Sequence, residues 1–155
     1  MLVRKALEQD IDSMVSLSYE KRREYEKAQP QFWKYAEGAE KIQASWFKEL
    51  LTNDQYIMLV TDDISAFLIG RIIPAPEVYD PGGLTLMIDD FCVKTPDLWK
   101  NHGRELIEQA KKLGKPKGVS QILVVCGHLD MPKREFLNSI NLSIASEWYV
   151  GNLME

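Results

Sequence analysis

The stretch from residue 84 to residue 126 constrains the fold of this 155-residue chain more than any other. It begins with the β-rich run LTLMIDDFCVK and ends with a second apolar run, VSQILVVC. Between them the spacing predicts an amphipathic helix, capped by Gly114, whose buried face is Leu106, Ile107, Ala110 and Leu113. Two strands joined through a helix need a crossover, which makes them parallel neighbours in one sheet. The chain is therefore expected to be an α/β domain.

The other segments extend this sheet on both sides of the crossover. YIMLVT and AFLIGRII, joined through Asp62 and Asp63, predict an antiparallel hairpin. The remaining expected elements are a strand over 2–6, helices over 11–29 and 39–50, a loop over 74–83, a short helix from Pro132 and a last strand over 143–151. The order is strand, two helices, three strands, helix, strand, helix, strand. We expect one domain over 1–155 with a mixed sheet.

Composition excludes several classes of protein. The net charge of −4 disfavours a nucleic-acid binder, which needs basic surface to neutralise phosphates. No apolar run is long enough to cross a bilayer, and residues 1–10 lack the apolar core of a signal peptide, so a cytoplasmic protein is expected. Two cysteines and two histidines without metal-ligand spacing predict no metal site.

The junction at residues 89–104, between strand and helix, is the candidate site for a phosphate-bearing ligand. The first N–H groups of a helix lack partners and carry partial positive charge, which favours an anion there. At the expected exposed first turn, Gly103 lets the backbone approach a ligand closely, and Arg104 adds positive charge. Taken alone, the junction is better explained as a plain crossover turn, so the wider motif decides.

That wider motif, DFCVKTPDLWKNHGRELI, resembles the acyl-CoA motif of the GNAT superfamily of N-acyltransferases. There a strand ends in apolar-x-Val, and a Pro-containing turn leads to Arg/Gln-x-x-Gly-x-Gly/Ala at a helix start. DMPKREFLNSINLSIASEWYV resembles the C-terminal motif of that family, and RKALEQDID its first strand and helix. The resemblance spans nearly the whole chain. It implies the GNAT fold, acetyl-CoA as co-substrate and an amine of a small molecule or protein as acceptor; homodimers are usual in that family.

The resemblance also implies which residues contact acetyl-CoA. The strand end at Phe91, Cys92 and Val93 would contact the thioester and the pantetheine arm through backbone groups. The other implied contacts are Leu98, Lys100, Asn101, His102, Gly103, Arg104, Asp130, Lys133 and Arg134.

The chain departs from the motifs at positions that matter for the chemistry. Leu98 stands where the loop has Arg or Gln, and Asn101 replaces its first glycine, which Asn partly compensates because it tolerates left-handed backbone angles. Leu137 stands at the position of the Tyr that commonly protonates the leaving thiolate. Because general acid help contributes about 10²–10⁴-fold, the missing Tyr predicts a slow enzyme. The changes at Leu98 and Asn101 predict weakened phosphate binding.

Three residues are candidate catalytic groups. Asp90 is expected to accept a proton from the amine, with Asp89 on the opposite strand face because side chains alternate. His128 is a second candidate base, with a suitable ordinary pKa. Tyr149, on the expected last strand, reaches either the cleft or solvent.

Two alternatives stay open on the sequence. The departures from the motif fit a GNAT-like protein that binds CoA or a partner without catalysis. A different α/β domain would bind a nucleotide at the same junction. Aromatic residues of the first two helices and their connection are either the wall of an apolar acceptor site or a lid over the core: Tyr25, Phe32, Trp33, Tyr35 and Trp46.

Overall fold

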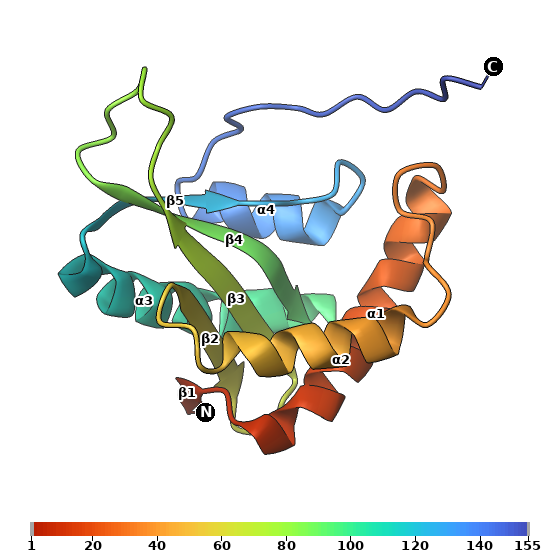
Figure 1. The fold of residues 1–155 in the computed structure, drawn as a ribbon, viewed down its shortest axis with the longest axis horizontal. Helices are drawn as coiled ribbons and strands as arrows, with labels where there is room; N and C mark the ends of the chain where they lie inside the picture. Colours follow the sequence, from red (N-terminus) through yellow and green to blue (C-terminus); the bar gives the residue numbers. More distant parts are fainter. Residues whose placement is uncertain (1, 155) are drawn as a thin grey trace.

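The computed structural model describes residues 2–154 and shows one five-stranded sheet with helices on both faces (Figure 1). The strands follow the spatial order β1-β2-β3-β4-β5, antiparallel except for the parallel pair β4–β5. Their bounds are Val3–Lys5, Tyr56–Thr61, Ala66–Ile73, Leu84–Val93 and Val119–Val124. The helices α1 to α4 span Ile11–Ala28, Ala39–Leu50, His102–Gly114 and Met131–Ser139. The expected mixed α/β fold and its crossover are confirmed.

Two hydrophobic cores lie on opposite faces of the sheet. Helices α1 and α2 pack on one face over Met14, Phe47, Val60, Phe67 and Ile69. Helices α3 and α4 cover the other face, over Leu68, Leu86, Ile88, Leu106 and Ile107. Strands β2 and β3 contribute to both cores, which explains why their sequences are apolar at nearly every position instead of alternating.

A β-bulge interrupts β4 at Asp89. Ile69 of β3 pairs with Asp90 and Gly70 pairs with Ile88, so Asp89 has no partner on β3. The extra residue breaks the alternation of side chains. The positive charge of Arg22 acts on both Asp89 and Asp90, opposing the rise in pKa that burial causes in each. The expectation that these two carboxylates point to opposite faces is therefore wrong.

The expected last strand over 143–151 is also wrong. After α4, Asn141 adopts a left-handed backbone with φ of 66°, and the Leu142 N–H closes the helix on Leu137 O at 3.1 Å. Residues 142–152 then have no regular secondary structure and extend away from the sheet (Figure 1). A strand needs an edge to pair with, and no strand among residues 2–154 pairs with this segment, although β5 is the last strand of the sheet. Trp148 instead contacts the ring of Phe32, with centroids 6.2 Å apart.

None of the helices in residues 2–154 has both the length and the mean hydropathy needed to cross a bilayer.

The first turn of α3 is packed more tightly than the sequence predicts. Gly103 is buried, and a Cβ there would lie 2.6 Å from the Trp99 ring and 3.4 Å from Phe136. The expectation of an exposed glycine is wrong, because the 3₁₀ turn Pro96–Lys100 folds Trp99 back over the helix start. Glycine at 103 is required by this close approach.

We predict that Gly103→Ala lowers the free energy of unfolding by about 1–3 kcal/mol, the usual cost of overpacking a dense core. At about 2–4 °C per kcal/mol for a chain of this size, the melting temperature should fall by several degrees. Thermal unfolding followed by circular dichroism measures it. Gly151→Ala is the control, because a Cβ at 151 has no atom within 4 Å. Equal melting temperatures for the two variants would contradict this packing role.

Candidate functional site

The candidate site lies where β4 and β5 separate. Their parallel pairing runs to Ile88 and Val124, and the Val125 N–H still donates to Ile88 O at 2.9 Å. Beyond Ile88, the rest of β4 has no strand partner on the β5 side among the described residues. The Lys94 N–H points to the other side, where it donates to Ser65 O at 2.7 Å. Because backbone groups alternate in direction along a strand, those of Phe91 and Val93 face the opening.

Lys133 of α4 lies against the edge of β4 beyond the end of its pairing with β5. Its side chain is buried, with 4% of the residue exposed, and its Nζ donates to Phe91 O at 2.8 Å. The ammonium also lies 5.5 Å from the ring centroid of Phe91 and 5.8 Å from that of Trp99. Burial lowers the pKa of Lys133, and nearby acidic groups only partly oppose this shift. A buried cation therefore lies at the unpaired edge of β4.

Asp90 lies on the α1 side of the same strand. Its Oδ1 is 3.3 Å from Arg22 Nη2, and its side chain is only 14% exposed. Burial raises the pKa of Asp90, and the positive charge of Arg22 opposes that rise. Gln43 lies beside the same guanidinium. With its amide assigned so that the oxygen faces Arg22, that oxygen accepts from Nη2 at 2.9 Å and from Nε at 3.2 Å. This series of hydrogen bonds, from Gln43 of α2 through Arg22 of α1 to Asp90 of β4, orients the Asp90 carboxylate.

Tyr25 ties α1 to the connection between β5 and α4. Its hydroxyl donates to Asp130 Oδ2 at 2.7 Å and accepts from the Gly127 N–H at 3.2 Å. Burial raises the pKa of Tyr25, and the Asp130 carboxylate raises it further, so the phenol stays protonated. Asp130 also caps α4, because its Oδ1 accepts from the Lys133 N–H at 3.3 Å. The Tyr25 tether thus holds the helix turn that carries Lys133.

The expected pyrophosphate turn lies between β4 and α3. Lys100, Asn101 and Arg104 are exposed around the helix start, while Leu98 is half-buried and packs against the core. His102 is half-buried, and its buried Nδ1 has no hydrogen-bond partner among the residues that the structure describes. The turn therefore presents two basic side chains to solvent at the N-terminus of a 13-residue helix.

A hollow of about 420 Å³ opens between α1, α2 and their connection. Arg22 and Gln43 form part of its lining, so it reaches the network that orients Asp90. Its wall is mostly aromatic and apolar: Phe32, Trp33, Tyr35, Ala36, Ala39, Ile42 and Trp46, with Lys34. Trp33 also packs edge-on against Tyr25, with centroids 5.1 Å apart.

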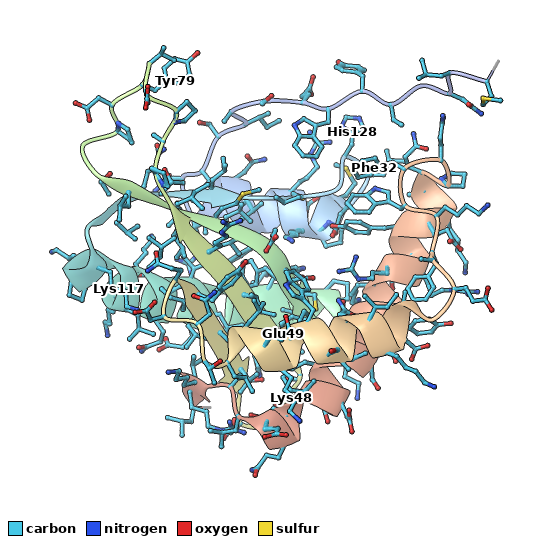
Figure 2. All side chains as sticks on the ribbon, in the orientation of Figure 1. Phe32, Lys48, Glu49, Tyr79, Lys117 and His128 are labelled. Atoms are coloured by element: carbon cyan, nitrogen blue, oxygen red, sulfur yellow. The ribbon has the colours of Figure 1, made fainter. Side chains whose placement is uncertain are left out.

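The other candidate residues fall into two groups. Cys92 and Cys126 lie near Lys133, and burial raises the pKa of their thiols to about 12 and about 11, so neither is a ready nucleophile. His128 is exposed on the β5–α4 connection, at the same end of the view as Phe32 (Figure 2), and its carbonyl accepts from Arg134 Nη1 at 2.9 Å. Tyr149 is 90% exposed, and its hydroxyl donates to Glu147.

The structure thus brings Asp90, Phe91, Cys92, Asp130 and Lys133 into one region, with Arg134 on the same helix turn. It leaves Tyr149 on the irregular C-terminal segment, because the strand expected to carry it does not form. Sequence reasoning missed Arg22 and Gln43. The spacing of Ser18, Arg22 and Tyr25 at i, i+4 and i+7 was the available signal, since it places all three on one helix face.

The sequence matches no protein-family model and no curated protein. Solved structures with the same fold are numerous. The chain is similar to a tetramutant of the BH1408 protein from Bacillus halodurans, with a TM-score of 0.82 and 19% identity over 99% of this chain and 100% of that one. It is also similar to a predicted acetyltransferase with acetyl-CoA from Clostridium acetobutylicum, with a TM-score of 0.70 and 18% identity over 99% and 96% of the two chains.

A third structure with this fold is the ribosomal-protein-alanine N-acetyltransferase from Brucella melitensis, with a TM-score of 0.65 and 15% identity over 99% and 100% of the two chains. The fold of this chain is therefore the fold of GNAT-type acetyltransferases.

We predict that Tyr25→Phe lowers the free energy of unfolding by about 1–3 kcal/mol, because Asp130 loses a donor and the Gly127 N–H loses its acceptor. Urea unfolding followed by fluorescence measures this change. Tyr79→Phe is the matched control, since Tyr79 is 71% exposed on the β3–β4 connection and should show no change. If both variants unfold like the wild type, the tether does not hold the α4 connection.

Proposed function

We propose that this chain is an N-acetyltransferase that transfers an acetyl group from acetyl-CoA to an amine of a small molecule or protein. The observation that carries the proposal is the opening between β4 and β5. There, backbone groups of Phe91 and Val93 that no strand of the described chain hydrogen-bonds lie between Asp90 and the buried Lys133, whose Nζ donates to Phe91 O. Acetyltransferases share this fold, including one crystallised with acetyl-CoA.

The residues at the opening fit the thioester arm of acetyl-CoA. Phe91 O accepts from Lys133 Nζ, and the remaining outward backbone groups of this edge can pair with an extended amide-containing chain as they would with another strand. Lys133 adds a buried ammonium whose hydrogen-bonding capacity is only partly used. At the other end of such a ligand, Lys100 and Arg104 at the start of α3 supply positive charge for a pyrophosphate. Acetyl-CoA supplies the activated acyl group, and the protein supplies orientation and proton transfer.

Asp90 is the proposed base. Its raised pKa means that the carboxylate holds a proton more strongly than an exposed aspartate does, which suits removal of a proton from the attacking amine. Arg22 and Gln43 fix its orientation from the side of the hollow. The aromatic wall of the hollow favours an acceptor whose amine is attached to an apolar or aromatic group.

A second candidate function is binding of CoA without transfer. Leu137, at the position of the usual catalytic Tyr, is buried in the α3–α4 core and offers no proton. The two functions differ in one measurement, since both require acetyl-CoA binding and only one releases CoA when an amine is present.

We predict that acetyl-CoA raises the melting temperature by several degrees, because a ligand at a hundredfold excess over its Kd adds about 2.7 kcal/mol to the free energy of unfolding. CoA release with a panel of aromatic and aliphatic amines then measures transfer. Asp90→Asn should slow transfer by about 10²–10⁴-fold and preserve the thermal shift. Glu108→Gln, on the exposed face of α3, should change neither quantity.

The outcomes separate the candidates. A thermal shift without CoA release from any amine supports the binding function. No shift with acetyl-CoA, but a shift with ATP or NAD, supports a nucleotide-binding domain. Asp90→Asn with full activity would contradict the role of Asp90 as the base.

We also propose a homodimer in which residues 143–151 of one copy pair with β5 of a second. Strand β5 is the last strand of the sheet, and its sequence VSQILV has none of the charged residues or prolines that block edge pairing. The segment itself exposes Ile144, Trp148 and Tyr149. We predict a dimer by light scattering and a monomer for Ser146→Pro, which removes a backbone donor from the pairing segment. A monomeric wild type, or a dimeric variant, would contradict strand exchange.

A further inference from the structure

The side chain of Lys133 is a buried charge that the fold does not require. An ammonium has three N–H donors, and among residues 2–154 the acceptor recorded for Nζ is Phe91 O. A cation removed from water needs more compensation than one carbonyl and two aromatic rings supply. A methionine of similar length would join α4 to β4 without that cost. The remaining N–H groups therefore have capacity for a ligand at the edge of β4.

The position of Lys133 on α4 also bears on the missing acid. Lys133 and Leu137 are four residues apart, so they lie on the same face of the helix, and both are buried toward β4 and α3. Leu137 has no proton to give. Lys133 is the ionisable group of that face, and Phe91 O holds its ammonium beside the backbone groups that face the opening.

We infer that Lys133 is a catalytic residue of the proposed acetyl transfer, donating a hydrogen bond to the acyl oxygen and then a proton to the departing thiolate. The inference rests on the proposed function. The Tyr25–Asp130 tether, which holds the first turn of α4, positions it. The lowered pKa supports the role, because an ammonium that loses its proton more easily is a better acid for a thiolate, whose ordinary pKa is about 8.5.

The step balances without any further reactant. The amine nitrogen forms a bond to the acetyl carbon, and the carbon–sulfur bond breaks with its electron pair on sulfur. The amine gives one proton to Asp90, and Lys133 gives one to the sulfur. The products are a neutral amide and a neutral thiol. Asp90 and Lys133, which interact electrostatically, both end neutral, and passage of one proton from Asp90 to Lys133 restores the starting state.

The experiment compares Lys133→Met with the wild type on two acyl donors. One is acetyl-CoA, and the other is the acetyl thioester of an aromatic thiol, whose thiolate is stable enough to leave without a proton. We expect the variant to lose about 10²–10⁴-fold on acetyl-CoA and to recover most of that loss on the aromatic thioester. Lys111→Met, on the exposed face of α3, is the matched control and should behave like the wild type on both donors.

A measurement without ligand tests the buried charge itself. The pKa of Lys133 in the folded state lies below its unfolded value of 10.5. Between these two pKa values the unfolded chain binds more protons than the folded one. The Lys133 side chain therefore makes the wild type more stable as the pH rises through that range. Lys133→Met should be at least as stable as the wild type at neutral pH, and its advantage should shrink toward pH 10.5. The difference between the proteins isolates Lys133 from the groups that face it: Asp90 and Cys92 of β4, Cys126 after β5, and Asp130 at the start of α4.

Three results would overturn the inference. The first is a Lys133→Met variant with the wild-type rate on acetyl-CoA. The second is an equal loss on both donors, which indicates a structural role. The third is a variant that is less stable than the wild type or fails to fold, because Lys133 then serves packing. If the proposed function is wrong, the wild type alone will show it, because it will not bind acetyl-CoA or will not transfer the acetyl group. In that case the inference about Lys133 fails as well.

Discussion

The separation of β4 from β5 after Ile88 is the constraint on which the site depends. The bulge at Asp89 adds a residue to β4 on the β3 side, at the point where pairing on the β5 side ends. A bulge increases the local twist of a strand and bends it. Past this bend, Phe91 and Val93 present backbone groups that no strand of the described chain pairs. Phe91 and Trp99 pack together on the α3 face, while Asp90 turns toward α1.

Two opposite charges flank this bend, and each is only partly compensated. Asp90 has the guanidinium of Arg22 at 3.3 Å, and Lys133 has the carbonyl of Phe91 at 2.8 Å. Burial shifts the pKa of both groups toward their neutral forms, which brings the two pKa values closer together. Perturbed groups of this kind gather at functional sites, because proton transfer needs an acid and a base of similar strength. Such charges reduce stability, and the two hydrophobic cores offset that cost.

Several residues near the site serve packing. Gly103 accommodates the Trp99 ring, and Leu137 completes the core beneath α4. Trp99 stacks on Phe136, with centroids 5.1 Å apart, so the turn after β4 is anchored to α4 by aromatic contact. The same aromatic layer surrounds Lys133 on one side. Residues of the sequence motif around the start of α3 thus also pack against the edge of β4.

The sequence by itself determined the elements and their order as far as α4, because hydrophobic periodicity and turn residues are local properties. It predicted the hairpin and the crossover through α3, since these follow from patterns within a few residues. The tertiary structure alone decided the partners of each functional group. Arg22 meets Asp90 across 68 positions of sequence, Tyr25 meets Asp130 across 105, and Lys133 meets Phe91 across 42. The structure likewise decided that residues 143–151 form no strand, because a strand exists only where another edge pairs with it, and β-propensity does not say whether that edge lies in the same chain.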